Sequence, residues 1–353
     1  MEHRIVAGVV DTAERRLSPV SASSAASMTA WRSDRGRLSL EVMPVPELLD
    51  DELLVRVQAC GLCRTDLHVI DRELPAHRPR VVPGHQVVGV VEQTGPATAG
   101  YSRGDVVGVA WLRRTCGSCR WCRSGRENLC PDSLYTGWDA HGGFAEYVSV
   151  PAAFAYRLPA DCDPVTTAPL LCAGIIGFRA LERANLPPGG RLGVYGFGSS
   201  AHITAQLAMA AGAEVYVMTR GEHHRAAAAA LGVAYAGGER DAPPHPLDSA
   251  IVFAPSGPLL MTALAATDRG GTVVAAGIHL SDIPAMDYRN HLFQERDLRS
   301  VAANTRADGD TLLRLAGTLH LTPTVTAVPF GRLEQGIAEL RTAAVGGSLV
   351  LAL

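Results

Sequence analysis

Four cysteines lie within fifteen residues, "CGSCRWCRSGRENLC", with the spacing C-x2-C-x2-C-x7-C: Cys116, Cys119, Cys122 and Cys130. Four thiolates this close suit a tetrahedral zinc ion, in which each Zn–S bond is about 2.3 Å long. Because four cysteines complete the coordination shell, an ion held here would brace a loop and leave no position for a reactant. A reacting metal would therefore need a second set of ligands elsewhere in the chain.

Three further candidate ligands are scattered through the sequence. Cys63 lies in "GLCRTDLH", His85 in "PGHQVVG" and Cys172 in "PLLCAG". Two cysteines and one histidine form a known catalytic zinc set, which keeps a fourth position open for water or a reactant. The pattern alone does not bring these residues together, and a single cysteine in an apolar segment such as that of Cys172 is also typical of an ordinary core residue.

A glycine-rich turn supplies a candidate nucleotide site. The segment "VYGFGSSAH" places Gly196, Gly198 and Ala201 as G-x-G-x-x-A between a strand pattern and a helix pattern. The first glycine permits the tight turn, the second lets the backbone approach a pyrophosphate, and the small third residue allows close packing of helix on strand. The free N–H groups at the helix N-terminus would bind the pyrophosphate. A glycine turn without a ligand is the weaker alternative.

The residues after the next strand pattern bear on the cofactor. An NAD site usually has an acidic residue about 20 residues after the glycines, which accepts a hydrogen bond from the ribose. Here Thr219 stands at that position and Arg220 follows it. An arginine can bind a 2′-phosphate that a carboxylate would repel, so the sequence favours NADP(H) over NAD(H). The alternative is that Arg220 is a solvated surface residue beside an NAD site.

The surrounding elements change character along the chain. Residues 53–150 contain short strand patterns separated by glycine and proline, as in a barrel-like β domain. From about Pro169 onward, strands alternate with helices, which predicts a parallel, doubly wound sheet. Residues 1–27 are small and polar towards their end and are predicted to be a poorly ordered extension.

Composition excludes several classes of function. The chain has 353 residues, enough for about two domains. It contains no lysine, which excludes a lysine Schiff base or a P-loop lysine, and its net charge of −3 offers no general attraction for nucleic acid or anionic membrane. The eight clustered cysteines without a signal-peptide pattern predict metal sites in the cytoplasm rather than disulfides. No run reaches the roughly 18 apolar residues of a membrane span.

Several motifs occur together in a fixed order: "GLCRTDLH", "GHQVVG", the four-cysteine run, "GGFAEY", "APLLCAG" and "GFGSSAH". In this the chain resembles the zinc-dependent medium-chain alcohol dehydrogenases from residue 28 to residue 353. The resemblance implies an α/β protein with a GroES-like β-rich catalytic domain and a Rossmann domain. We expect the former at 28–173 and 306–353, with a structural zinc lobe at 112–131, and the latter at 174–305.

The resemblance also assigns the metal ligands. It implies that Cys63, His85 and Cys172 bind a catalytic zinc, while the four-cysteine run binds a structural one, giving two zinc ions per chain. Cys60 would then be a core residue at a strand end, and Cys162 would have no role in the site.

A proton relay is implied next to these ligands. Thr65 matches the hydroxyl that passes the proton to the nicotinamide ribose, and His68 matches the outer base. Asp66 is expected to orient a metal-bound imidazole, that of His85. The structural alternatives are a turn-capping hydroxyl for Thr65, a surface histidine for His68 and a helix N-cap for Asp66. Gln86 departs from the glutamate usual in the family, and we expect zinc to be retained with altered ligand exchange.

The implied activity is reversible hydride transfer between a primary or secondary alcohol and a nicotinamide cofactor. Ile70, Trp111 and Leu112 are expected to line an apolar substrate pocket, and Trp138 is a weaker candidate. The alternative is that the tryptophans fill the core. The resemblance also suggests a homodimer or homotetramer that assembles through the Rossmann domains.

Two other functions compete with this one. A zinc-free reductase of the same superfamily would lack the ligand set found here. A nucleic-acid-binding module built on the zinc loop would use the nearby arginines: Arg113, Arg114, Arg120, Arg123 and Arg126. The net charge and the nucleotide-binding half argue against such a module, so a small-molecule substrate is expected, with neither nucleic acid nor membrane as a partner.

Overall fold

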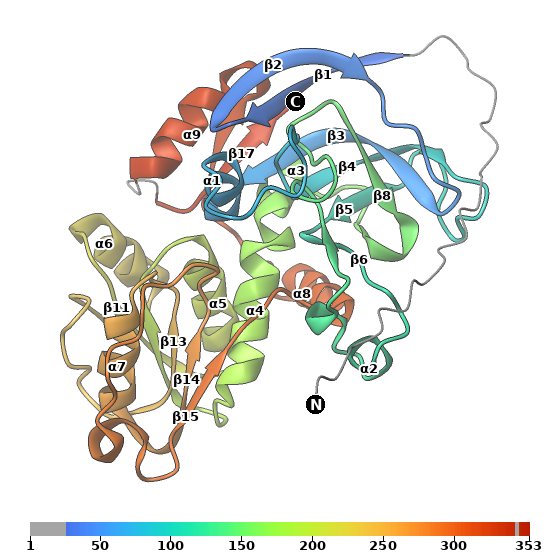
Figure 1. Ribbon diagram of the computed structural model, residues 1–353. Helices are drawn as coiled ribbons and strands as arrows, with labels where there is room; N and C mark the ends of the chain where they lie inside the picture. Colours follow the sequence, from blue (N-terminus) through green and yellow to red (C-terminus); the bar gives the residue numbers. More distant parts are fainter. Residues whose placement is uncertain (1–25, 343–345) are drawn as a thin grey trace, which may run out of the picture.

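The computed structural model describes residues 26–342 and 346–353, which form two sheet-based parts joined along helix α4 (Ala173–Ala184), as Figure 1 shows. Residues 1–25 of the expected extension lie outside the described residues. Strand β1 (Ser27–Asp34) pairs with β2 (Arg37–Pro44) in an antiparallel ribbon.

The first part is built on a seven-stranded sheet of described residues, in the order β16-β17-β3-β4-β5-β9, with β8 also paired to β3. Most of its pairs are antiparallel, and β16 pairs with β17 in parallel. Its strands are β3 (Glu52–Leu62), β4 (Gln86–Thr94), β5 (Val106–Val109), β8 (Tyr147–Pro151), β9 (Ala155–Arg157), β16 (Val325–Pro329) and β17 (Ser348–Ala352).

Strand β3 is almost fully buried, because both of its faces meet a hydrophobic core. Leu53, Val55 and Val57 face a cluster beneath the β1–β2 ribbon and helix α9 (Leu333–Thr342). Ala59 faces a cluster formed with α4 and α8 (Arg306–Leu319). The helical segments of this part are α1 (Arg64–Ile70), η2 (Ala152–Phe154), α3 (Pro164–Thr167), η3 (Ala168–Leu171), α8 (Arg306–Leu319), η5 (Phe330–Arg332) and α9 (Leu333–Thr342).

The second part is a parallel sheet whose described strands follow the order β12-β11-β10-β13-β14-β15. This is the 3-2-1-4-5-6 order of a doubly wound dinucleotide-binding sheet, as the alternation of strands and helices predicted. Its elements are β10 (Arg191–Tyr195), α5 (Ser199–Ala210), β11 (Glu214–Met218), α6 (Glu222–Leu231), β12 (Tyr235–Gly237), β13 (Leu247–Val252), α7 (Gly257–Ala266), β14 (Thr267–Ala275), η4 (Tyr288–Leu292) and β15 (Asp297–Ser300).

Both faces of the parallel sheet are covered. Residues of α4, α5 and α6 form one core cluster with inward-facing strand residues, and residues of α7 form the other. The helices α4 and α8 begin at Ala173 and Arg306, close to the expected domain boundaries, which stay a prediction.

The four cysteines lie in a lobe that projects from the first part. It contains β6 (Leu112–Arg114), α2 (Arg120–Arg123), η1 (Glu127–Leu129) and β7 (Leu134–Tyr135).

Among the described residues, no single helix is long and apolar enough to cross a membrane. One pair bent by 42°, Pro164–Leu171 with Ala173–Ala184, meets that test by length and composition alone.

Candidate functional site

The three scattered ligand candidates converge. The Sγ atom of Cys63 and the Nε2 atom of His85 are 3.4 Å apart, and the same nitrogen is 3.4 Å from Cys172 Sγ. All three ligand atoms lie within 4.8 Å of one another. In a tetrahedral zinc site with bonds of about 2.1–2.3 Å, sulfur and nitrogen are about 3.5 Å apart. The spacing therefore fits a zinc ion with one position open.

Three separate elements bring these side chains together. Cys63 is the N-cap of α1, immediately after β3, and His85 immediately precedes β4. Because β3 and β4 are antiparallel and Gly61 pairs with Gln86, the end of one strand lies beside the start of the other. Cys172 lies at the break between η3 and α4, where the chain turns towards them.

The N-cap of α1 is Cys63 and not Asp66, which is the third residue of that helix and whose carboxylate has two partners. Its Oδ2 accepts a hydrogen bond from the backbone N–H of Cys63 at 2.8 Å, which forms a capping box at the start of α1. Its Oδ1 lies 3.1 Å from His85 Nδ1. This bond fixes the tautomer of His85 with Nε2 directed towards the two thiols.

The charges of these groups also suit a cation. Burial on its own would lower the pKa of His85, but its neighbours Cys63 and Asp66 raise it to about 10. The hydrogen bond from Cys172, together with burial, raises the pKa of Cys63 well above its usual range. Thiolate and neutral imidazole are the forms that bind a divalent ion, so metal binding at these side chains would release protons.

Gln86 lies behind this set and is 2% exposed. Its side chain fits only because residue 61 is glycine: a Cβ there would lie 2.8 Å from Gln86 Oε1. Its Nε2 has no hydrogen-bond partner among the described residues. The position that the family usually fills with a carboxylate is therefore neutral in this chain and has a buried, unpaired donor.

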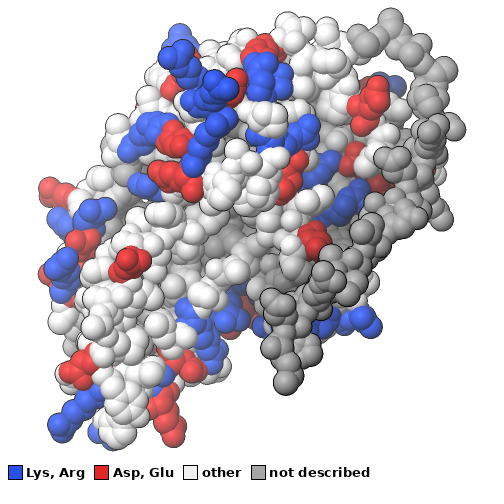
Figure 2. Space-filling view, in the orientation of Figure 1, with Lys and Arg blue, Asp and Glu red and all other residues white. Residues whose placement is uncertain are grey.

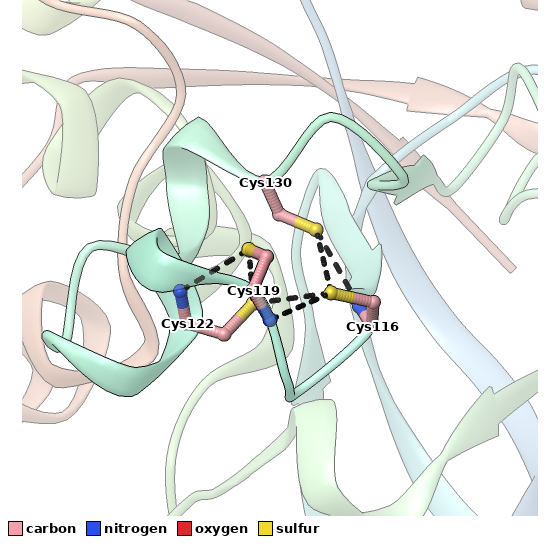
Figure 3. A group of neighbouring side chains, drawn as sticks. All are labelled: Cys116, Cys119, Cys122 and Cys130. Atoms are coloured by element: carbon pink, nitrogen blue, oxygen red, sulfur yellow. Dashed lines mark hydrogen bonds between the residues drawn. The ribbon is translucent and has the colours of Figure 1, made fainter.

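The four cysteines form a closed cage (Figure 3). The Sγ atoms of Cys119 and Cys122 are 3.5 Å apart, as are those of Cys130 and Cys116. The Sγ atoms of Cys116 and Cys122 are 3.9 Å apart. In a tetrahedron with Zn–S bonds of about 2.3 Å, each edge is about 3.8 Å. Hydrogen bonds from the backbone of Ser118 and Cys119 lower the pKa of the Cys116 thiol to about 6, which favours the thiolate that binds metal.

The arginines near this cage contact the protein itself. The guanidinium groups of Arg120 and Arg126 lie over the ring of Trp121, at 4.3 and 4.8 Å. Arg123 donates to the carbonyl of Ser118. On the face visible in Figure 2, basic and acidic side chains are interspersed. Arg120, Arg123 and Arg126 thus have partners within the lobe itself.

The remaining two arginines form ion pairs. Arg114 binds Asp51 through two hydrogen bonds of 2.9 and 3.1 Å, and Arg113 binds Glu52 at 2.6 Å. The Arg113–Glu52 pair is buried, with side chains 8% and 5% exposed, whereas Arg114 and Asp51 are partly exposed. The two neighbouring pairs therefore allow a direct comparison of buried and exposed charges.

Replacing Glu52 by glutamine is expected to lower the free energy of unfolding by about 3 kcal/mol, because it leaves the buried cation of Arg113 without its counter-ion. The Asp51→Asn variant, which removes the charge of the exposed pair, should lose at most about 1 kcal/mol. Urea unfolding followed by tryptophan fluorescence measures both. Equal losses in the two variants would contradict the buried-pair argument.

The glycine turn has the form needed to hold a pyrophosphate. Gly196 has φ +85°, and a Cβ there would lie 3.0 Å from the backbone nitrogen of Ala254. At Gly198, the N-cap of α5, a Cβ would meet no described atom within 4 Å, so the backbone faces open space. Ala201 is fully buried in the core beneath. The described N-terminus of α5 has no side-chain cap, which leaves its N–H groups available to an anion.

The turn and the metal ligands share one cleft of about 990 Å3 between the two parts. Thr219 and Arg220 line its far end, beyond β11. Thr219 is buried, whereas the side chain of Arg220 is 78% exposed and lies 3.3 Å from a carboxylate oxygen of Glu239.

Thr65 and His68 lie on one face of α1 and line the cleft. Both are buried, which excludes the surface-histidine alternative for His68. The Nδ1 atom of His68 contacts a carboxylate oxygen of Glu73, whose side chain is 51% exposed. Glu73 is not evident from the sequence, because its contact with His68 depends on a turn in which the Glu73 N–H donates to the carbonyl of His68.

Two of the expected pocket residues do not line the cleft. Ile70 is 1% exposed and packs in the core, since it lies about 200° around the helix from His68. Leu112 is also buried and begins β6 directly after Trp111. Trp111 does line the cleft, and so does Trp138, the weaker candidate. Tyr135 also lines it and was not expected from the sequence. The rings of these three residues stack 5.0–5.9 Å apart.

A doubly wound dinucleotide-binding sheet beside a β-rich domain that presents an open Cys-His-Cys set, with a closed four-cysteine lobe, defines the class of medium-chain dehydrogenases. Residues 49–160 match the protein-family model of the alcohol dehydrogenase GroES-like domain. A Mycobacterium tuberculosis (strain CDC 1551 / Oshkosh) protein named "Probable alcohol dehydrogenase AdhA" is 53% identical over 94% of this chain and 99% of its own length.

Two solved structures are similar throughout. A cinnamyl alcohol dehydrogenase of Sorghum bicolor has a TM-score of 0.85 and 28% identity, over 93% of this chain and 98% of the other. The cobalt- and zinc-bound thermostable alcohol dehydrogenase of Pyrobaculum aerophilum has a TM-score of 0.85 and 26% identity, over 93% and 100%. The chain belongs to the zinc-dependent medium-chain alcohol dehydrogenase family. It is an NAD(P)-dependent alcohol dehydrogenase.

Proposed function

We propose that the protein transfers hydride reversibly between a primary or secondary alcohol and NADP(H), with one zinc ion bound by Cys63, His85 and Cys172 and a second by the four-cysteine lobe. The observation that carries the proposal is that an open set of three ligand atoms within 4.8 Å lines the same cleft as the glycine turn. A zinc-free reductase would have no use for that set.

The residues around the set divide the chemical work. When bound, zinc supplies Lewis acidity towards the oxygen of the alcohol or carbonyl, and the nicotinamide accepts or donates the hydride. Asp66 holds His85 in the ligating orientation. The edge of the His85 ring meets the face of Trp111, with centroids 4.9 Å apart, which excludes water from one side of the site.

The alcohol proton leaves through Thr65 and His68. Both side chains line the cleft that also contains the ligand set and the glycine turn. Glu73 contacts Nδ1 of His68, so a neutral His68 that donates from Nδ1 keeps Nε2 as a proton acceptor. Because Glu73 is half exposed, the relay ends at solvent.

The stacked rings of Trp111, Tyr135 and Trp138 supply an apolar wall beside the ligand set. A flat or elongated apolar tail fits such a wall better than a charged one. We therefore propose an alcohol or aldehyde with an aliphatic or aromatic tail as substrate. A homodimer or homotetramer and a location in the cytoplasm stay predictions.

A substrate panel run in parallel with NADPH and NADH, together with metal analysis of the purified protein, tests the proposal. Two zinc ions per chain and faster aldehyde reduction with NADPH are expected. One zinc ion or none would contradict the metal assignment. A clear preference for NADH would contradict the cofactor assignment while leaving the reaction class intact.

Replacing Gln86 by glutamate is expected to change how firmly the neighbouring metal is held. A carboxylate adds a negative charge in a buried position, where charge interactions are strong. We expect a shifted pH–rate profile and a different rate of zinc release to a chelator. Gln86→Met, which keeps the volume without a charge, is the control. If Gln86→Glu left both the pH profile and zinc release unchanged, the role of Gln86 would be wrong.

A further inference from the structure

The adenosine end of the cleft contains a carboxylate that the sequence analysis did not anticipate. Glu239 lines the same cleft as Thr219 and Arg220. It lies two residues beyond the end of β12 (Tyr235–Gly237) rather than beyond β11, after which an NAD-binding acid is usually sought.

The strand register places Glu239 beside Arg220. Strands β11 and β12 are parallel neighbours, in which Met218 pairs with Gly237. The Thr219 N–H continues the ladder by donating to the carbonyl of Gly237 at 3.0 Å. Arg220 follows Met218 by two residues, and Glu239 follows Gly237 by two residues. The two side chains meet, with Arg220 Nε 3.3 Å from Glu239 Oε2.

The backbone on the carboxylate side is held by a turn. The Gly238 N–H donates to Asp241 Oδ2 at 2.7 Å, and the Asp241 N–H donates to the carbonyl of Gly238 at 3.0 Å. Within this turn, Arg240 Nε lies 4.0 Å from the second oxygen of Glu239. One carboxylate is thus bracketed by two arginines. Its side chain is 30% exposed, against 78% for Arg220 and 76% for Arg240.

This arrangement acts differently on the two forms of the cofactor. A ribose 2′-phosphate is a dianion that pairs with Arg220 but is repelled by a carboxylate already bound to that arginine. A 2′-hydroxyl carries no charge and is not repelled. Arg220 therefore favours NADP(H), while Glu239 opposes it.

We infer that Glu239 is a specificity-determining residue that limits the preference for NADP(H) by occupying the arginine to which the 2′-phosphate would bind. The inference rests on the proposed binding of the adenosine ribose beside Arg220. It makes the chain an enzyme with modest cofactor discrimination, in which the preference is set by the balance between Arg220 and Glu239.

Steady-state kinetics of E239Q, R220Q and the control E222Q test this inference. Glu222 opens helix α6, close to the same site, but forms no ion pair with Arg220 among the described side chains. We expect E239Q to raise the ratio of kcat/KM for NADPH to that for NADH by about fivefold, as for one partly exposed charge pair. E222Q should leave the ratio unchanged, and R220Q should lower it.

Inhibition by adenosine 2′,5′-bisphosphate and by 5′-AMP separates binding from hydride transfer. E239Q should strengthen inhibition by the bisphosphate alone. If E239Q leaves both the cofactor ratio and bisphosphate inhibition unchanged while R220Q lowers them, the inference is overturned and the proposed role of Arg220 stands. If R220Q also leaves them unchanged, the placement of the 2′-phosphate is wrong, and the inference fails with it.

Discussion

Replacing Cys172 by alanine is expected to remove one of two zinc ions per chain and to lower kcat/KM by at least about 1,000-fold. Stabilisation of transition-state charge by a metal is worth several kcal/mol, and about 4 kcal/mol corresponds to this factor. The three ligand atoms lie within 4.8 Å of one another, so the loss of one leaves only Cys63 and His85 to hold the ion. Zinc analysis and alcohol oxidation kinetics measure the two effects.

The matched control is Cys162→Ala. Cys162 is a partly exposed cysteine that belongs to neither of the metal-ligand groups found among the described residues. It should retain two zinc ions and full activity. A Cys172→Ala protein that keeps both zinc ions, or that loses one without losing activity, would contradict the assignment of this set to catalysis.

Replacing Cys130 by serine is expected to remove the other zinc ion and to destabilise the protein by several kcal/mol. The binding free energy of structural zinc sites is about 10–16 kcal/mol in peptides, and much of it is folding free energy. The structure adds an effect on the cleft. Asn128 donates to the carbonyl of Ala302 at 2.7 Å, and Glu127 accepts from the Arg306 backbone at 3.0 Å. Because Asn128 and Ala302 line the cleft, KM should rise as well.

Cys116→Ser separates the loss of metal from damage to the core, since Cys116 is exposed whereas Cys130 is buried. Both variants should contain one zinc ion and unfold at a lower temperature. The Ser124→Ala variant changes an exposed hydroxyl of the same loop and should behave as the parent protein does. Normal thermal stability in both cysteine variants would show that the lobe does not need its metal.

The local motifs were predictable from the sequence because their residues are neighbours along the chain. The four cysteines span fifteen residues, so their spacing alone predicts a cage. The glycine turn is likewise read from consecutive residues. In contrast, Cys63, His85 and Cys172 meet through the pairing of β3 with β4 and the break before α4, which spacing does not encode. The convergence of these three ligands was predicted only because the chain shares the order of several motifs with the medium-chain alcohol dehydrogenases.

The two wrong pocket predictions, and the two carboxylates that were not predicted from the sequence, have equally specific causes. Ile70 and Leu112 were expected in the pocket because they lie close in sequence to residues that line it, but helical and strand geometry directs them into the core. Glu239 depends on the register of two parallel strands, and Glu73 on a single turn. The N-cap alternative for Asp66 is wrong because α1 begins earlier than that alternative requires, with Cys63 as the N-cap and Asp66 as the third helical residue.

The pairing of β17 with β3 determines the order in which the protein can be completed during synthesis. Leu349 pairs with Leu62, so the sheet that carries Cys63 includes residues from both ends of the described chain. The strands of the parallel sheet all lie within residues 191–300 and can pair as soon as they have emerged from the ribosome. The nucleotide-binding sheet can therefore form first. Residues 52–56 of β3 can pair with β8 early, whereas residues 59–62 remain unpaired on that side until residues 348–352 have been made.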